Sequence, residues 1–528
     1  MYEGRGSNHW LYFSGFITAA DTTLPAHVAV DPSGLELPRI SVNLPQSRPR
    51  VLAHIGAHGQ ICYAAQGSIV LDIFDIAGQT LGCIGRATEV LDKALRGEME
   101  KDLEDEFFVF WHGELCFLDI YTKDSNTLDV VFARHNKAES YIAIVSNDAS
   151  RTQEKLKAMA FSEQNFFPGA AFRVHTSAKP KPQQGAWPPA NVANLLQWQG
   201  LLDPAAKRNI ESRLLKAISS KKTSVLCVID SPLTQYAFWV KLDEPKDHPP
   251  TRRKRDLRVK LYAAPVYPMN SIRMDDKYIA ERNSPGSPTL AGKHIAVIGC
   301  GTIGGFLSEL LVKAGAGLES GALALIDPDI LLPQNIGRHH LGLNHALQYK
   351  ANALQEELSN SAPTAQIKSH PVRAEDIDLT QFDLVINATG EEALGHYLTR
   401  KSVDTGKFVP TLSVWIEGPG IAVRALLQDS PTAACTRCLA DSQRTPRYPV
   451  TNEPIPTELA GHGCESLYVP FPAHVSVQAA CLGMEVVACW LTNKPSPRLR
   501  TKMTRSGFSS ATPDIDPEHQ TTCPACHS

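Results

Sequence analysis

Residues 294–314 read HIAVIGCGTIGGFLSELLVKA and decide the fold of the C-terminal half of the chain. The apolar run His294–Ile298 predicts a strand, and the apolar spacing of Thr302–Ala314 predicts a helix. Between them lies the pattern G-x-G-x-x-G, in which glycines let the backbone approach phosphates and the helix N-terminus supplies N–H donors. The three glycines are Gly299, Gly301 and Gly304. This stretch therefore predicts a nucleotide site at the end of a buried strand.

Strands and helices alternate in the residues that follow. Ala322–Ile326 predicts a strand that ends at Asp327, and Gln348–Leu358 predicts a helix. A further strand is expected at Leu384–Ala388, so the pattern is that of a parallel, doubly wound α/β sheet. Asp327 lies about twenty residues beyond the glycines, where a carboxylate can accept hydrogen bonds from ribose hydroxyls. These residues alone favour an NAD-dependent Rossmann oxidoreductase.

Further polar residues change this interpretation. They follow in the order Asp329, Asn335, Arg338 and Lys350. The set resembles the ThiF/MoeB-type adenylating domain of ubiquitin-activating enzymes, with its glycine loop, Asp-x-Asp, Asn-x-x-Arg and helix-borne lysine. The resemblance implies that ATP is bound instead of NAD, with Asp327 at the ribose. It also implies that Asn335, Arg338 and Lys350 contact phosphates, which suits adenylyl transfer because fixed cations stabilise a triphosphate whose charge migrates.

The expected magnesium site departs from this family. Its members usually have Thr-Asp after the third strand, and the aspartate holds Mg²⁺. Here Thr389 is followed by Gly390, Glu391 and Glu392. We expect Mg²⁺ as a cofactor, while the residue that binds it stays open between a glutamate and another ligand.

The 12 cysteines do not form a disulfide scaffold, because the chain is long and not Cys-dense. Two Cys-x-x-Cys pairs have the spacing of a closed tetrahedral Zn²⁺ site. The expected ligands are Cys435, Cys438, Cys523 and Cys526. ThiF/MoeB-like domains carry a structural zinc of this kind. Cys526-His527 also completes the Cys-x-x-Cys-His pattern of haem attachment, but the second cysteine pair favours zinc.

Two other cysteines are candidate nucleophiles. Cys464 lies in a glycine-rich stretch beside His462, and its place after the adenylating core matches the catalytic cysteine of ubiquitin-activating enzymes. The alternative is an incidental loop thiol. Cys62 follows an expected strand meander and ends the element Gly59-Gln60-Ile61-Cys62, which is similar to ubiquitin-conjugating enzymes. Their His-Pro-Asn is incomplete here, because Ile55 and Gly56 follow His54. The remaining six cysteines are expected in the core, namely Cys83, Cys116, Cys227, Cys300, Cys481 and Cys489.

The expected elements outside the nucleotide domain are mostly short. The predicted strands are Trp10–Thr18, His27–Asp31, Arg39–Leu44, Arg50–Ile55, Ser68–Phe74, Phe107–Phe110, Thr127–Ala133, Tyr141–Val145, Ser224–Ile229 and Ala237–Leu242. Ala77–Arg96 and Asn191–Ile218 predict helices. The charged stretch Asp243–Arg258 is interpreted as a solvated loop.

Together these features resemble bacterial fusions of a ubiquitin-conjugating domain to a ThiF-type activating domain, found in anti-phage and related ubiquitin-like modification systems. We expect an α+β conjugating-like domain at 1–150, an α+β connector at 151–284 and the adenylation domain at 285–528. The resemblance implies adenylation of a partner's C-terminus, a thioester on Cys464, transfer to Cys62 and conjugation to a lysine. The partner is a ubiquitin-like protein or a nucleotide cyclase. Homodimers are expected, with Arg282 as the arginine lent to the neighbouring subunit.

Composition limits the other functions. Lys+Arg 52 against Asp+Glu 55 gives a net charge of -3, so no basic footprint indicates nucleic acid. The most apolar segment, Val475–Leu491, carries Glu485 and is interpreted as a buried helix, so no membrane span is expected. Met1–Phe16 lacks a signal-peptide layout, which predicts a cytoplasmic protein. A sulfur-carrier adenylyltransferase, an oxidoreductase and an inactive scaffold remain as alternatives.

Overall fold

The structure is a computed structural model that describes residues 2–5, 9–45, 51–56, 58–65, 67–121, 126–184, 187–232, 234–242, 250–461 and 467–527. The chain divides into two compact units. The first contains residues 1–149 and 161–273, and the second contains residues 150–160 and 274–528.

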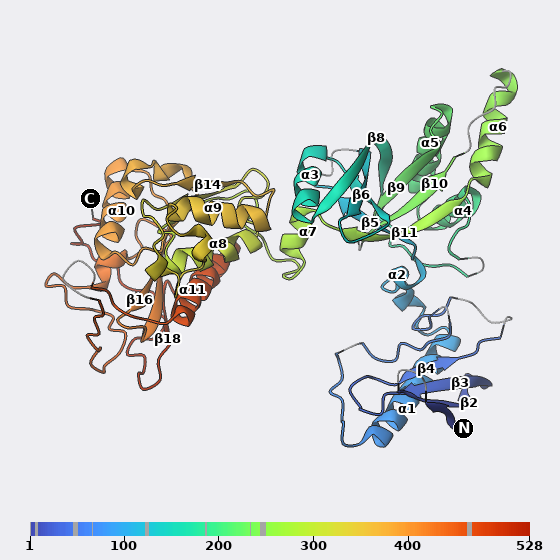
Figure 1. The fold of residues 1–528 in the computed structure, drawn as a ribbon, viewed down its shortest axis with the longest axis horizontal. Helices are drawn as coiled ribbons and strands as arrows, with labels where there is room; N and C mark the ends of the chain where they lie inside the picture. Colours follow the sequence, from blue (N-terminus) through green and yellow to red (C-terminus); the bar gives the residue numbers. More distant parts are fainter. Residues whose placement is uncertain are drawn as a thin grey trace. The chain divides into compact units, whose positions relative to one another are not determined.

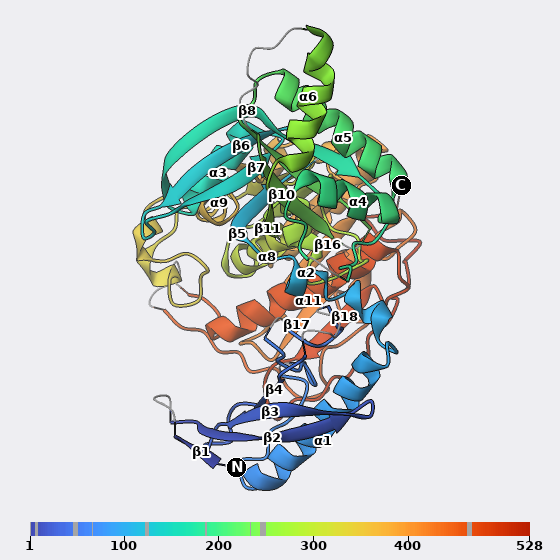
Figure 2. The same cartoon turned by 90° about the vertical axis from the view of Figure 1, so that its right-hand side faces the viewer.

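The first unit begins with a four-stranded antiparallel meander, as expected (Figures 1 and 2). Its strands are β1 (Tyr2–Arg5), β2 (Leu11–Ala19), β3 (Thr22–Val30) and β4 (Arg39–Val42). Helix α1 (Ile76–Leu95) covers one face of this sheet, because Ala87 and Leu91 recur on one side of the helix and are buried against the strands. Two strand predictions between β4 and α1 were wrong. Of the predicted strand Arg50–Ile55, Arg50 lies outside the described residues and the rest takes part only in isolated bridges, Leu52 with Ile55 and Ile55 with Ile61. Ser68–Phe74 forms turns and coil.

A closed seven-stranded β-barrel follows in the same unit, in the order β10-β11-β5-β7-β6-β8-β9. The strands are β5 (Glu114–Asp119), β6 (Thr127–His135), β7 (Tyr141–Ser146), β8 (Phe161–His175), β9 (Ser224–Asp230), β10 (Gln235–Lys241) and β11 (Val266–Arg273). Alternate residues such as Leu128 and Val130 fill its interior. Strands β5–β7 and β8–β11 belong to one barrel, although the predicted domain boundary at residue 150 lies between them.

Helices pack on the outside of the barrel. They are α4 (Val192–Leu202), α5 (Pro204–Ser219) and α6 (Pro250–Ala263). The helix predicted at Asn191–Ile218 is thus two helices, since Asp203 ends α4 and caps α5. Of the loop predicted at Asp243–Arg258, residues 243–249 lie outside the described part of the chain, and the part from Pro250 onward is helix α6 instead. Phe107–Phe110 is helix α2 rather than a strand.

An aromatic cluster joins α2 to the barrel. Phe107 stacks on Trp198 and meets Tyr236 edge-on, and the Trp111 Nε1–H donates to the carbonyl of Ala237 at 3.0 Å. Both Phe107 and Trp111 are fully buried. Since large aromatic side chains bury much apolar area in defined orientations, this cluster fixes the end of the first domain against the barrel.

The second unit contains a seven-stranded sheet in the order β14-β13-β12-β15-β16-β17-β18. The strands are β12 (His294–Ile298), β13 (Ala322–Ile326), β14 (Ile367–His370), β15 (Leu384–Asn387), β16 (Thr411–Glu417), β17 (Ala422–Gln428) and β18 (Leu499–Met503). The first five strands in this order, from β14 to β16, pair in parallel. Strand β17 pairs antiparallel with both β16 and β18. The predicted doubly wound α/β fold is confirmed.

Helices cover both faces of this sheet. One face carries α8 (Thr302–Lys313), α9 (Lys350–Ser361) and α11 (Ala473–Thr492), while α10 (Glu392–Thr405) packs on the other. The remaining helices in the described part of the chain are short. They are α3 (Ala149–Ala158), α7 (Asp276–Glu281), η1 (Glu100–Leu103), η2 (Pro333–Asn335), η3 (Leu343–His345), η4 (Ala374–Asp376), η5 (Leu379–Gln381) and η6 (Thr436–Leu439).

Helix α11 is long and apolar enough to cross a membrane by length and composition alone. It instead packs on α8 and β17, with Val475, Ala479 and Val486 in the core of the unit. The prediction that this segment is a buried helix is confirmed.

Candidate functional site

A cleft of about 680 Å³ opens where β12, β13 and β15 end. In open parallel sheets, ligands bind at the carboxyl ends of the strands, where the loops diverge. The lining includes the predicted residues Gly299, Gly301, Asp327, Asp329 and Lys350. The sheet therefore brings these five residues to one edge.

The three glycines have different structural roles. Gly299 has φ +88°, a left-handed conformation that favours glycine. A Cβ on Gly304 would collide with the carbonyl oxygen of Gly299, so this glycine allows α8 to approach the end of β12. Gly301 lines the cleft, and a Cβ on this residue would meet nothing within 4 Å. The loop therefore leaves room for phosphates at Gly301.

This difference predicts opposite outcomes for two alanine variants. Gly304→Ala is expected to lower the free energy of unfolding by about 1–3 kcal/mol, since overpacking forces the backbone to shift. Gly301→Ala is expected to leave thermal unfolding unchanged and to weaken ATP binding, because its methyl group fills the space for a phosphate. Calorimetric unfolding and ATP titration of both variants measure this. Unchanged ATP affinity in Gly301→Ala would contradict the assignment of the cleft.

Asp327 is held rigidly at the base of the cleft and is only 6% exposed. One carboxylate oxygen accepts the Cys300 N–H at 2.8 Å, and the other accepts the Asp329 N–H at 2.8 Å. Burial raises the pKa of Asp327, while these N–H groups and Lys350 oppose the rise. The carboxylate is thus oriented before a ligand arrives.

Lys350 begins α9 and points its ammonium to the cleft. Its Nζ lies 2.8 Å from Asp329 Oδ2, and its side chain is 14% exposed whereas that of Asp329 is 67% exposed. Because the aspartate is well solvated, this ion pair contributes little stability. The lysine can therefore exchange the carboxylate for a phosphate oxygen.

Asn335, Arg338 and Arg282 do not line the cleft. Asn335 Oδ1 accepts the Leu332 N–H at 2.9 Å. The Arg338 guanidinium lies 4.5 Å from the ring centre of Phe471, which is itself a lining residue. Arg282 is exposed after the end of α7. The phosphate roles of Asn335 and Arg338 and the subunit-bridging role of Arg282 stay predictions.

Several lining residues lack a recognisable local motif. Arg373 and Glu375 pair at 2.8 Å on the loop after β14, Tyr397 comes from α10, and Phe471 precedes α11. Glu391 also lines the cleft, whereas Glu392 does not. Of the two glutamates left open for Mg²⁺, Glu391 is therefore the better placed.

His339 is hydrogen-bonded to the backbone of the glycine loop. Its Nδ1 accepts the Leu341 N–H at 3.1 Å, so its Nε2 carries the proton and donates to the Cys300 carbonyl at 2.9 Å. Burial lowers the pKa of His339 to about 4, which keeps the ring neutral. Cys300 is fully buried, and its burial raises the pKa of the thiol, as suits a packing residue.

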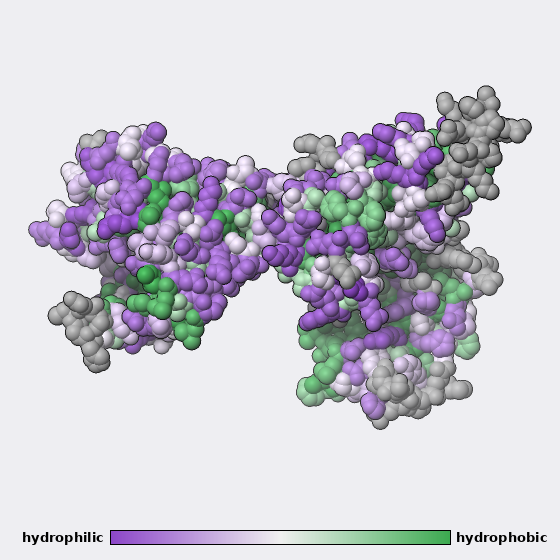
Figure 3. All heavy atoms as spheres, turned by 45° about the horizontal axis from the view of Figure 1, so that its top comes forward, coloured by the Kyte–Doolittle hydropathy of each residue, from purple (hydrophilic) through white to green (hydrophobic). Residues whose placement is uncertain are grey.

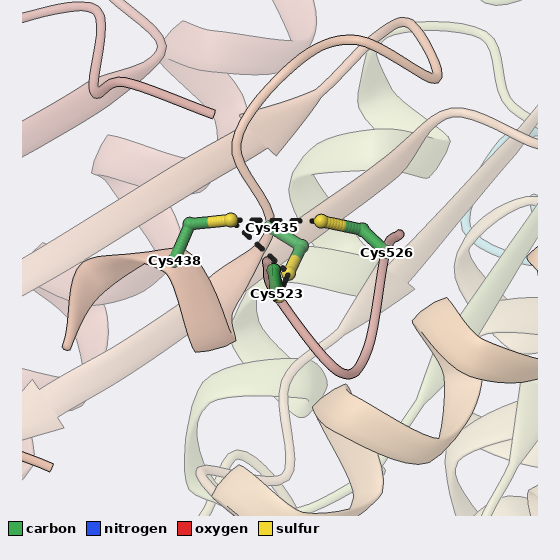
Figure 4. A group of neighbouring side chains, drawn as sticks. All are labelled: Cys435, Cys438, Cys523 and Cys526. Carbon is green, nitrogen blue, oxygen red and sulfur yellow. Dashed lines mark hydrogen bonds between the residues drawn. The ribbon is translucent and has the colours of Figure 1, made fainter. Parts of the chain in front are cut away.

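The four predicted zinc ligands converge in a buried group (Figure 4). The sulfur atoms of Cys435 and Cys438 are 3.8 Å apart, those of Cys435 and Cys523 3.7 Å, and those of Cys438 and Cys526 3.5 Å. Zn–S bonds of about 2.3 Å in a tetrahedron place sulfurs about 3.8 Å apart. The residues therefore fit a structural Zn²⁺ ion, and four thiolates leave no open position for a substrate.

Of the two candidate nucleophiles, Cys62 lies in the described part of the chain. Cys464 lies outside the residues that the structure describes. Cys62 is exposed after the meander, and it lines a groove of about 720 Å³ together with His54 and Glu106. Its N–H donates to the His54 carbonyl at 2.7 Å. The sequence did not indicate Glu106, which comes from the turn before α2.

Family models match two parts of the chain. The ThiF family model matches residues 278–525, and the prokaryotic E2 family B model matches residues 8–115. Both confirm the resemblances stated from the glycine loop and from the environment of Cys62. They favour an adenylating domain over an NAD-dependent oxidoreductase.

Whole-chain relatives combine both parts. An ATP-dependent ubiquitin transferase-like protein Cap2 of Pseudomonas aeruginosa is 44% identical over 530 residues, which cover 100% of this chain and 96% of that protein. A Cap2 of Escherichia coli is 26% identical, covering 96% and 92%. The crystal structure of Escherichia coli MccB matches with a TM-score of 0.35 at 14% identity, covering 52% and 72%, a likeness too low to support a functional conclusion. The 44% identity over the whole chain shows that the protein belongs to the family of ATP-dependent ubiquitin transferase-like Cap2 proteins.

Proposed function

We propose that this protein is an enzyme that activates the C-terminus of a partner protein with ATP and conjugates it to a target amine. The observation that carries the proposal is the presence, on one chain, of a nucleotide cleft in a ThiF domain and an exposed cysteine in an E2 family B domain. A sulfur-carrier adenylyltransferase needs only the first of these.

The proposed reaction has four steps. A carboxylate oxygen of the partner's C-terminus attacks the α-phosphate of ATP, and the bond to the leaving pyrophosphate breaks. The Cys464 sulfur then attacks the acyl-adenylate and releases AMP. Transthiolation moves the acyl group to Cys62. A lysine amine finally attacks this thioester and releases the thiol.

The cleft offers suitable groups for the first step. Asp327 is oriented to accept ribose hydroxyls, and Lys350 supplies a cation near Gly301, where space is open for phosphates. Mg²⁺ bound to ATP would neutralise further charge, with Glu391 as its candidate ligand. The lysine and the backbone donors act by positioning and charge stabilisation, which suits a step that needs no acid or base from the protein.

Apolar side chains near Cys62 support a protein partner. Figure 3 shows green, hydrophobic patches that interrupt a largely hydrophilic surface. Val70 and Phe74 are 97% and 93% exposed, and the neighbouring Ile69 and Leu71 line the groove of Cys62. Exposed apolar groups rimmed by polar residues are typical of protein interaction surfaces.

The donor in this proposal is a ubiquitin-like protein or the C-terminus of a nucleotide cyclase, and the acceptor is a lysine of a target protein. The proposal includes a homodimer in the cytoplasm with Arg282 reaching the neighbouring ATP site, and a role in anti-phage defence. Pyrophosphate exchange with each donor separately identifies the donor, since only the true carboxylate supports exchange.

Variants of the two cysteines separate activation from conjugation. Cys62→Ala is expected to keep donor-dependent ATP–pyrophosphate exchange and to lose all conjugate, because the last acyl carrier is missing. Cys464→Ala is expected to keep exchange and to lose both thioesters. Non-reducing gels and intact mass spectrometry of ATP–donor mixtures record the products.

Cys481→Ala is the matched control, because this cysteine lies half-buried on α11 and lines neither the nucleotide cleft nor the groove of Cys62. Conjugate formation at the normal rate by Cys62→Ala would contradict the conjugating role and favour the sulfur-carrier alternative.

A further inference from the structure

The groove around Cys62 contains a fixed carboxylate. Five charged or titratable side chains other than Cys62 line it within the described part of the chain: Glu36, Arg39, His54, Tyr63 and Glu106. Glu36 and Arg39 pair with each other at 3.1 Å, and both are 59% exposed, so they largely neutralise one another. Glu106 is only 16% exposed. It is therefore the carboxylate whose position the fold determines.

His54 connects Glu106 to the backbone of Cys62. The backbone N–H of His54 donates to Glu106 Oε2 at 2.7 Å, and its ring Nδ1 lies 2.6 Å from Glu106 Oε1. The carbonyl of the same residue accepts the Cys62 N–H at 2.7 Å. One residue thus sets the distance between the carboxylate and the nucleophile.

Asp102 holds His54 from the other side. Its Oδ2 lies 3.1 Å from Nε2 of the ring, so both ring nitrogens face a carboxylate oxygen. His54 also has φ +63°, a backbone conformation that non-glycine residues adopt rarely. Uncommon backbone conformations persist where the surroundings impose them, and they are concentrated at functional sites.

Transfer from a cysteine thioester to an amine requires a proton to be removed from the attacking nitrogen. When a neutral amine attacks the carbonyl carbon, its nitrogen becomes cationic and must lose a proton before the carbon–sulfur bond breaks productively. The sulfur leaves poorly as a thiolate here, because burial and the charge of Glu106 raise the pKa of the Cys62 thiol. A group that takes the proton from nitrogen and gives it to sulfur resolves both difficulties.

We propose that Glu106 is this proton carrier and that His54, held by Asp102, is its positioning residue. The amine nitrogen bonds to the thioester carbon, and Glu106 takes the proton from nitrogen. The carbon–sulfur bond then breaks, and the sulfur of Cys62 receives the proton from Glu106. The products are an amide and the neutral thiol, so the carboxylate is regenerated. This inference rests on the proposed acyl-carrier role of Cys62.

The experiment loads Cys62 without the ATP site. The full chain is incubated with the benzyl thioester of N-acetylglycylglycine, and mass spectrometry of peptides confirms acylation of Cys62. After removal of excess thioester, discharge is followed separately with free lysine and with hydroxylamine. The cationic nitrogen formed by attack of the strongly basic lysine amine is a weak acid and needs a base to remove its proton. The cationic nitrogen formed from the weakly basic hydroxylamine is a stronger acid and loses its proton to water.

Glu106→Gln keeps the shape and one hydrogen-bond acceptor but cannot take the proton. It is expected to slow lysine discharge roughly 100-fold, the size of a general-base contribution, and to leave hydroxylamine discharge unchanged. His54→Asn is expected to slow lysine discharge less, with the same selectivity. Asparagine tolerates the left-handed backbone, so this variant removes the ring and keeps the chain path.

Glu104→Gln is the matched control. Glu104 lies two residues away and pairs with Lys179 at 3.4 Å, outside the groove lining. Equal lysine discharge by Glu106→Gln and the wild type overturns the proposal. Equal loss with both nucleophiles also overturns it, because that result indicates a structural role. If wild-type Cys62 accepts no acyl group at all, the conjugating function itself fails, which is a distinguishable outcome.

Discussion

Replacement of Lys350 by methionine is expected to reduce donor-dependent ATP–pyrophosphate exchange by about 10²–10³-fold, the usual cost of removing one preorganised charge from a reacting oxyanion. Methionine keeps most of the apolar stem and removes the ammonium. In the described lining of the cleft, the cations are Lys350 and Arg373, and Arg373 is 72% exposed and already paired with Glu375. Lys350 is therefore the cation that the fold holds in place.

The control for this variant is Lys313→Met. Lys313 ends α8 on the surface and pairs with Glu309 at 3.4 Å, with 66% of its side chain exposed. It is expected to retain full exchange. Titration of ATP distinguishes lost binding from lost chemistry, because a larger fall in rate than in affinity indicates stabilisation of the transition state. Normal exchange in Lys350→Met would remove the lysine from the proposed reaction.

The nucleotide fold could be predicted because its signals are local. The run His294–Ile298, the glycines and the helix beyond them lie within twenty-one residues, 294–314, and the structure has the strand at the predicted bounds. Asp327 follows a strand that was also predicted to the residue. The four cysteines are equally local within each pair, and a Zn²⁺ ion shared by all four would explain why the two pairs meet.

The remainder of the cleft could not be predicted, since it depends on which strands become neighbours. Arg373 follows β14 and Tyr397 lies on α10, and no spacing rule connects either residue to Gly301. Likewise, Glu106 is distant in sequence from Cys62, and only the turn before α2 brings it to the groove. Arg338 is the opposite case. The sequence motif predicts it at the phosphates, but in this structure its guanidinium packs against Phe471.

The barrel was missed for a related reason. Strands β9 and β10 were predicted from their β-branched and aromatic residues, but closure requires β11 to pair with β5, about 150 residues earlier. Short alternating strands do not reveal such pairings. The aromatic run Phe107–Phe110 predicts a strand, whereas the structure has helix α2, in which Phe107 packs against Trp198 and Tyr236, contacts that the local sequence does not contain.

Loss of one zinc ligand is expected to have the largest effect on the second unit. Structural Zn²⁺ sites bind with about 10–16 kcal/mol in small zinc domains, which is comparable to the whole stability of a typical domain. Cys526→Ser replaces a thiolate by a hydroxyl that remains protonated, and it leaves three buried thiols without a closed site. We expect the variant to lose stoichiometric zinc and to unfold its second unit at a lower temperature.

The cysteines hold the C-terminal segment against the loop after β17. Gln520 Nε2 donates to the carbonyls of Cys438 and Ala440 at 2.8 Å each, and Arg447 pairs with Glu518 at 2.7 Å. These neutral or solvent-exposed contacts are individually weak. Without the metal they would have to hold the two segments alone, so proteolysis within 440–447 and 515–527 is expected to accelerate.

The same site also anchors the start of the segment that carries Cys464, because Cys435 and Cys438 precede it along the chain. Cys526→Ser is therefore expected to lose thioester formation together with zinc, even under conditions where ATP still binds. Metal analysis, calorimetry and non-reducing gels test the three effects, with Cys481→Ser as the control. One zinc per chain and unchanged unfolding in Cys526→Ser would show that Cys526 is not a zinc ligand, because a tetrahedral centre cannot lose a thiolate without a large loss of affinity.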